Sequence, residues 1–296
     1  MKNFEYRAPT SLGEAVALLA EKGDKARPLA GGTDLIVQLR VGRYELDRVV
    51  DLKRIPEVNQ LSYDPVDGLV IGAAVPCYRI YTDEVIAVHY PGLIDAATIV
   101  GGIQIQGRAS LGGNLCNASP SGDTIPGLIV LEGTAVIAGP HGTRAVPVEE
   151  FCTAPGRTVL QPGEVLVSLR FPPPQPRSGA FYLRFIPRNE MDIAIVGAGA
   201  SVVLSEDLST FVAARVALGA VAPTPLYVPE AGAALAGLPV SEESIAQAAE
   251  IARQAARPIS DMRGTVEQRQ HLSAVLTKRA LRGAVARAKG ETVRGH

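Results

Sequence analysis

The chain has 296 residues, of which 47% are hydrophobic, and this is enough apolar material for two domains rather than one. Its 29 basic and 30 acidic residues are interspersed and give a formal net charge of -1, which excludes the basic field of a nucleic-acid-binding protein. Neither a secretory apolar segment nor a run of the ~20 apolar residues that span a bilayer is present in the sequence. We therefore expect a cytoplasmic chain without a membrane span.

The N-terminal segment predicts a compact α/β unit. A helix is expected over residues 11–23, because Ser11 and Glu14 form a capping box and Gly23 suits the helix end. A strand is expected at 26–30, followed by a glycine pair, a helix over 33–42 and a strand over 47–52. This order of elements is typical of a small α/β lobe.

The next segment predicts mainly β-structure. Hairpins are expected over residues 58–75 and 134–148, where "DPVDG" and "GPHG" supply turns, with a helical region at 83–100 between them. A strand over 163–171 closes this part. The proline-rich "FPPPQPRSG", residues 171–179, is then expected to be a linker.

The C-terminal part predicts an α+β domain. Three antiparallel strands are expected over 180–186, 192–204 and 210–221, followed by helices over 241–256, where Ser241 is the N-cap, and 264–288. "VGAGASVVL" resembles half of a dinucleotide fingerprint, but a β-branched run follows it, so a closely packed strand is the better interpretation. The fold class is therefore α+β.

Two glycine-rich stretches suggest a phosphate-binding site. In "AGGT", Gly31 and Gly32 stand between a strand and a helix, where positive φ is available and backbone N–H groups can converge on an anion. A simple tight turn is the alternative. The second stretch, "SLGGNLCNASPSGD", ends at Asp123, which could cap the following helix or accept hydrogen bonds from ribose or ribityl hydroxyls.

The three cysteines give no metal or disulfide pattern. Cys77, Cys116 and Cys152 are widely separated, so neither a zinc site nor an iron-sulfur cluster of the CxxC type is expected. We expect Cys77 and Cys152 to be small buried hydrophobic residues. No metal ligand is predicted in this chain.

The order of motifs resembles a known family. "PLAGGTDLIVQLR", "DLKRI", "GRASLGGNLCNASPSGD" and "YLRFIPRNEMDIAIVGAGA" follow one another as in the FAD-binding medium subunits of the molybdenum hydroxylases, such as carbon monoxide dehydrogenase and xanthine dehydrogenase. The resemblance implies a two-lobed FAD-binding domain of the vanillyl-alcohol-oxidase type over residues 1–176, with lobes at about 1–55 and 56–176. It also implies a C-terminal domain over 177–290.

The resemblance also nominates cofactor-binding residues. Those of the first glycine stretch would hold the FAD pyrophosphate, those of the second would form another phosphate loop with Asn117 at the flavin or its chain, and Asp123 would bind the polyol. The "RNEMDIA" run would lie beside the isoalloxazine, and Arg184 stands where lysine is common, which leaves its contact open. The set is Leu29, Ala30, Gly31, Gly32, Thr33, Asp34, Leu35, Ser110, Gly112, Gly113, Asn114, Asn117, Asp123, Leu166, Arg184 and Asp192.

The implied activity is that of an oxidoreductase subunit. In the family, electrons pass from a molybdenum cofactor in a large subunit through [2Fe-2S] clusters in a small subunit to the flavin and then to an acceptor. The chain would bind FAD noncovalently, because no histidine lies in either glycine stretch, and it would need no catalytic residue of its own. The implied assembly is a dimer of heterotrimers.

Two functions of other classes remain open from the residues alone. A protein that binds a nucleotide phosphate without redox chemistry could use the same glycine stretches, and the identity of the bound molecule would distinguish it. A stand-alone FAD-dependent oxidase would have its own substrate pocket. Its flavin would be reduced by a small molecule without any partner.

Overall fold

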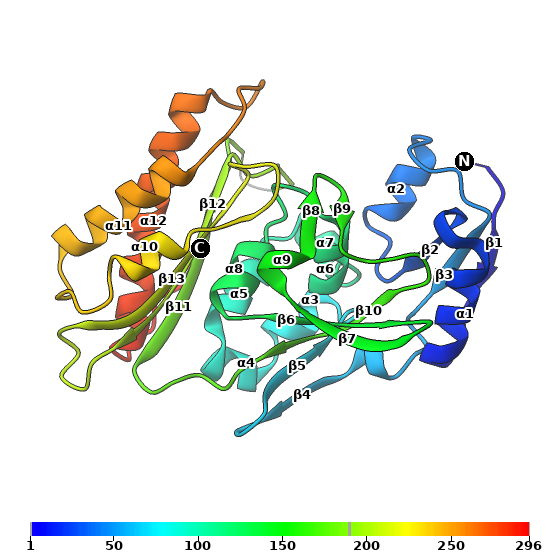
Figure 1. Ribbon diagram of the computed structural model, residues 1–296, viewed down its shortest axis with the longest axis horizontal. Helices are drawn as coiled ribbons and strands as arrows, with labels where there is room; N and C mark the ends of the chain where they lie inside the picture. Colours follow the sequence, from blue (N-terminus) through cyan, green and yellow to red (C-terminus); the bar gives the residue numbers. More distant parts are fainter. Residues whose placement is uncertain (1, 189–190, 296) are drawn as a thin grey trace.

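The computed structural model describes residues 2–188 and 191–295, and Figure 1 shows its arrangement. The N-terminal lobe is a parallel sheet in the order β1-β3-β2. Two helices and a 3-10 turn complete it. The bounds are β1 (Glu5–Arg7), α1 (Leu12–Lys22), η1 (Gly23–Lys25), β2 (Ala26–Leu29), α2 (Leu35–Arg40) and β3 (Arg48–Asp51).

The second lobe is built on a five-stranded antiparallel sheet in the order β4-β5-β10-β6-β7. Its strands are β4 (Leu61–Asp64), β5 (Gly68–Gly72), β6 (Thr134–Gly139), β7 (Gly142–Pro147) and β10 (Val165–Phe171). The connections contain η2 (Glu57–Asn59), α3 (Cys77–Tyr81), α4 (Glu84–His89), α5 (Pro91–Ala97), α6 (Ile103–Gln106), α7 (Leu111–Asn117), α8 (Ile125–Val130), α9 (Val148–Phe151), and the small hairpin of β8 (Cys152–Ala154) and β9 (Arg157–Thr158).

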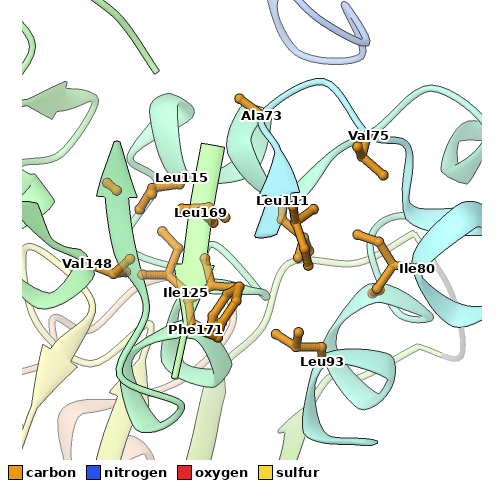
Figure 2. Close-up of a cluster of buried hydrophobic side chains, with 14 of the residues drawn as sticks. Ala73, Val75, Ile80, Leu93, Leu111, Leu115, Ile125, Val148, Leu169 and Phe171 are labelled. Atoms are coloured by element: carbon orange, nitrogen blue, oxygen red, sulfur yellow. The ribbon is translucent and has the colours of Figure 1, made fainter. Parts of the chain in front are cut away.

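Apolar clusters organise these lobes. Figure 2 shows the largest of them, which includes Leu111 and Leu115 of α7 and Leu169 of β10. A second cluster includes Ala15 and Leu19 of α1 together with Val136 of β6. The N-terminal lobe therefore packs directly against the five-stranded sheet, and this contact fixes the two lobes relative to one another.

The C-terminal sheet lies between two layers of helices. Its order is β11-β12-β13-β14; α12 packs on one face with α11 against α12, while α5 and α8 pack on the other face. The bounds are β11 (Ser178–Phe185), β12 (Val196–Leu204), β13 (Phe211–Gly219), β14 (Leu226–Tyr227), α10 (Pro229–Ala233), α11 (Glu242–Ala255) and α12 (Val266–Ala288). In the described part of the chain, no helix combines the length and the apolar character needed to cross a bilayer.

The "VGAGASVVL" segment is β12, as predicted. A Cβ atom at Gly199 would lie 2.9 Å from the carbonyl oxygen of Pro126 in α8, so this glycine allows the helix to approach the sheet. The three predicted strands are all present. The sheet also contains β14, whose two residues are too few to show a periodic pattern.

One of the remaining predictions differs from the structure, and two agree with it. The helical region at 83–100 is two helices, because Tyr90 leaves the helical conformation and Pro91 starts α5. The segment 172–177 connects β10 to β11 without regular structure, as its prolines predicted. Ser11, Gly23 and Ser241 occupy the predicted cap positions.

A buried ion pair joins the C-terminal helix to the second lobe. Asp95 of α5 and Arg287 of α12 form a bidentate pair with N···O distances of 2.6 and 2.8 Å, and their side chains are 5% and 8% exposed. Arg287 also donates to the carbonyl oxygens of Ala180 and Val293. We call this contact the interdomain clamp.

Candidate functional site: a cleft between the two lobes

A cleft of about 930 Å³ runs between the N-terminal lobe and the second lobe. Residues from β2, α2, α7, β9 and β10 line it. Most of the residues nominated from the sequence are among them, namely Leu29, Ala30, Gly31, Gly32, Thr33, Asp34, Leu35, Ser110, Gly112, Gly113, Asn114, Asn117, Asp123 and Leu166. Segments about 80 residues apart in the chain thus meet at one surface.

The first glycine pair forms the turn between β2 and α2. Gly32 has a φ of +80°, which favours glycine, and a Cβ atom at Gly31 would overlap the backbone carbonyl of Arg108. Within the described chain, the backbone N–H groups of residues 31–34 have no protein acceptor. The turn therefore offers a row of free donors at the cleft, which is the arrangement that binds anionic oxygens.

The second glycine pair lies in a helix rather than in a loop. Leu111 and Leu115, four residues apart, bury one face of α7, and the side chain of Ser110 caps the helix by accepting from the N–H of Gly113 at 3.0 Å. A Cβ atom at Gly112 would lie 2.5 Å from the carbonyl oxygen of Ala73. This glycine therefore lets the helix pack against the second lobe, while Gly113 faces the cleft.

Asp123 does not cap the helix that follows it. The N-cap of α8 is Thr124, and no side chain makes a capping hydrogen bond there. Oδ2 of Asp123 instead accepts from Nη1 of Arg184 at 2.5 Å, while its buried Oδ1 has no partner in the described structure. Burial raises the pKa of Asp123 to about 6, although the Arg184 guanidinium acts to lower it.

Arg184 and Asp192, which the sequence also nominated, do not line the cleft. Arg184 is connected to the cleft by its hydrogen bond to Asp123, which lines the cleft. Arg184 also donates to the carbonyl oxygen of Asp192 at 3.4 Å. The Asp192 carboxylate accepts from Arg188 at 3.1 Å. Two residues of the "RNEMDIA" run, 189 and 190, lie outside the described residues, and the place of that run beside the isoalloxazine stays a prediction.

Comparison with family models decides the relationship. Residues 2–174 match the model described as "FAD binding domain in molybdopterin dehydrogenase", and residues 181–284 match that of the "CO dehydrogenase flavoprotein C-terminal domain". The chain belongs to this family. It is an FAD-binding subunit of the molybdenum hydroxylase type and thus part of an oxidoreductase.

Individual relatives match this chain over nearly its whole length. The carbon monoxide dehydrogenase medium chain of Afipia carboxidovorans is 33% identical over 97% of this chain and 98% of its own. The xanthine dehydrogenase FAD-binding subunit of Escherichia coli O157:H7 is 32% identical over 97% of each chain. A solved carbon monoxide dehydrogenase structure from Hydrogenophaga pseudoflava superposes with a TM-score of 0.92 at 32% identity, covering 97% of this chain and 98% of that one.

The cleft of this flavoprotein subunit fits FAD. The free N–H groups of residues 31–34 suit a diphosphate, and the unpaired Oδ1 of Asp123 suits a hydroxyl donor, since a buried acceptor without a partner is costly. Leu166 lies at the wall of the cleft, but it is only 2% exposed and belongs to the apolar cluster that also contains Leu115 and Leu169. A cavity of this size is within the range of ligand pockets.

Several residues that support the glycine turn escaped the sequence analysis. Nζ of Lys53 donates to the carbonyl oxygen of Ala30 at 3.2 Å and pairs with Asp51 at 2.7 Å, so the "DLKRI" motif anchors the turn. Nε of Arg108 donates to the carbonyl oxygen of Gly31 at 3.3 Å. The sequence of that motif gave no physical role for Lys53, because its bond to Ala30 joins residues 23 positions apart in the chain.

The β8–β9 hairpin also lines the cleft without having been predicted. Thr153, Gly156, Arg157 and Thr158 face it, and the N–H of Gly156 donates to the carbonyl oxygen of Ala118 at 2.9 Å. Arg157 thereby brings a cation to the same cleft as the glycine turn. The strands of this hairpin are three and two residues long, too short to produce an alternating pattern.

Proposed function

We propose that this chain binds FAD noncovalently in the cleft and serves as the flavin subunit of a molybdenum-containing dehydrogenase. In that complex it would receive electrons from [2Fe-2S] clusters of a partner subunit and deliver them to an external acceptor. The observation that carries the proposal is that both glycine segments and the buried Asp123 carboxylate meet at one cleft. Bound FAD supplies the electron-transfer chemistry, and the chain supplies binding and orientation.

The proposed roles of the residues follow from their donors and acceptors. The N–H groups of residues 31–34 would bind the pyrophosphate, with the segment 110–114 beside them, and Asp123 would accept from the polyol. Arg184 would act by holding Asp123. We propose no catalytic residue in this chain, and burial supports this for Cys116, since it raises the pKa of that cleft thiol to about 12 and keeps it protonated.

The proposal also covers the domains of the chain, its partner subunits and its location. We propose that residues 1–176 bind FAD, that residues 177–290 form a separate C-terminal domain, and that a large molybdenum subunit and a small iron-sulfur subunit complete a dimer of heterotrimers. The similarity to carbon monoxide dehydrogenase structures supports such partners. The free thiols of the three cysteines support a cytoplasmic location, because thiols persist in reducing compartments.

The first experiment measures what the purified chain binds. We expect about one FAD per chain, released into the supernatant by acid precipitation. In the Gly32→Val variant the flavin should be lost, and Gly42→Val is the matched control because Gly42 also has positive φ, +76°, but lies outside the cleft. A colourless chain that carries another nucleotide, or flavin that stays in the pellet, would contradict the proposal.

The second experiment tests the electron path. The FAD-loaded chain is mixed anaerobically with the substrate of the large subunit, first alone and then with the iron-sulfur and molybdenum subunits. Bleaching of the flavin band only in the full mixture supports the proposal. Rapid bleaching of the isolated chain by an organic substrate would instead indicate a stand-alone oxidase.

A further inference from the structure

Gln38 and Asn117 come from opposite walls of the cleft and contact one another. Gln38 lies in α2, six residues after Gly32, and Asn117 is the last residue of α7. Nε2 of Gln38 donates a hydrogen bond of 2.9 Å to Oδ1 of Asn117, and both partly buried side chains line the cleft. This bond links α2, which follows the first glycine pair, to α7, which contains the second.

The direction of this bond decides what Asn117 can offer to a ligand. An asparagine amide has one acceptor oxygen and one NH₂ donor. With Gln38 on the oxygen, the free group is the Nδ2 donor, which has no acceptor within residues 2–188 and 191–295. We propose that Gln38 is a positioning residue, which holds Asn117 so that Nδ2 donates to an acceptor oxygen or nitrogen of the bound FAD; this rests on the proposed FAD site.

The advantage of such a contact is preorganisation. Without a partner on its oxygen, the Asn117 amide can turn over and present Oδ1 to the cleft, where it would face acceptor atoms of the cofactor. Fixing the amide before the cofactor arrives avoids the cost of ordering it during binding. The backbone of Gln38 is fixed on both sides, since its N–H donates to the carbonyl oxygen of Asp34 at 2.9 Å and its own carbonyl oxygen accepts from the N–H of Arg43, after the end of α2, at 2.9 Å.

A double-mutant cycle on the full-length chain tests the proposal. The dissociation constant of FAD is measured by fluorescence titration for the wild type, Gln38→Met, Asn117→Ala and the double variant. Methionine keeps the length of glutamine but has no donor. We expect Gln38→Met to weaken FAD binding about tenfold, equivalent to about 1.4 kcal/mol, in the wild-type background, and less than about twofold in the Asn117→Ala background.

Two further variants separate positioning from a general structural effect. Gln38→Glu places an acceptor against Oδ1 and should turn the Asn117 amide over, so its loss of affinity should exceed that of Gln38→Met and the excess should shrink in the Asn117→Ala background. Gln254→Met is the control, because Gln254 also donates from a helix to a side-chain oxygen, at 3.0 Å to Glu250, but outside the cleft. It should leave FAD affinity unchanged.

The melting temperature of the FAD-free chain and the visible circular dichroism of bound FAD complete the test. We expect the dichroism to change with Gln38→Met and the melting temperature of the variant to match that of the Gln254→Met control. An unchanged FAD affinity in Gln38→Met, or an equal loss in both Asn117 backgrounds, would overturn this inference alone. A wild-type chain that binds no FAD would overturn the proposed function as well.

Discussion

The interdomain clamp gives the largest stability effect that we expect from a single substitution. Arg287→Met removes the guanidinium that pairs with Asp95, whose side chain is only 5% exposed. Breaking a buried ion pair by removing one partner costs about 3 to 5 kcal/mol, because the remaining charge stays buried. Asp95 keeps the hydrogen bond that its Oδ2 accepts from the N–H of Tyr182 at 3.2 Å, but this uncharged donor does not replace the guanidinium. The unfolding entropy of a 296-residue chain is about 0.6 kcal/mol/K, so the melting temperature should fall by about 5 to 8 °C.

The assay is thermal unfolding of the FAD-free chain, followed by circular dichroism and calorimetry. Arg282→Met is the matched control, because Arg282 lies on the same helix α12 and pairs with Glu242, but their side chains are 50% and 62% exposed. Exposed pairs contribute little, so this control should change the melting temperature by less than about 2 °C.

A second variant tests the physical cause. The double variant, Asp95→Leu combined with Arg287→Met, replaces both partners by apolar residues. It removes both buried charges and should recover most of the stability lost in Arg287→Met. The reasoning would be refuted if Arg287→Met lowered the melting temperature no more than Arg282→Met. It would also be refuted if the double replacement were less stable than Arg287→Met.

Further predictions concern the cleft. Gly32→Ala should weaken FAD binding less than Gly32→Val, because alanine brings a Cβ 2.9 Å from Leu29 but no β-branch; flavin retained per chain measures this, and equal retention would contradict it. Lys53→Met should raise the FAD dissociation constant about three- to tenfold by releasing the Ala30 carbonyl, and an unchanged titration would argue against this role. FAD affinity should rise with pH through about 6 as Asp123 ionises to an acceptor-only carboxylate, and Asp123→Asn should flatten this profile. In the FAD-free chain the sign reverses: the pKa of this group is raised on folding, so stability should fall as pH rises from about 4 to about 6, as urea unfolding would show.

Elements with a clear period were predictable from the sequence. Strands β5, β6, β10 and β12 have alternating or continuous apolar runs, and α1 and α11 have capping residues at the expected positions. These signals depend on neighbours within a few residues, so no knowledge of the tertiary structure was needed. At the cleft, the two glycine stretches and Asp123 were predictable from residue chemistry, whereas the remaining site residues followed only from the resemblance.

Helix α7 shows why part of the site could not be predicted. Two adjacent glycines favour a loop on local grounds, because glycine has a low helix propensity. The helix forms because Leu111 and Leu115 are buried and because only a residue without Cβ lets α7 approach Ala73. Tertiary packing therefore overrides the local preference, and only the structure reveals it.

The long-range contacts were also inaccessible. Gln38 and Asn117 are 79 residues apart, Lys53 reaches back to Ala30, and nothing in the local pattern of either segment marks these partners. The role of Asp123 was left open between a helix cap and a hydroxyl acceptor. The structure excludes the cap because the carboxylate points to Arg184 instead.

The position of the clamp also sets an order of events during synthesis. Arg287 leaves the ribosome 192 residues after Asp95, which corresponds to about 10 to 40 seconds at ordinary elongation rates. Strand β11, which packs on α5, is made in the first half of that interval, whereas Arg287 of the interdomain clamp becomes available only at its end. The second lobe therefore reaches its final set of contacts only when α12 has been made.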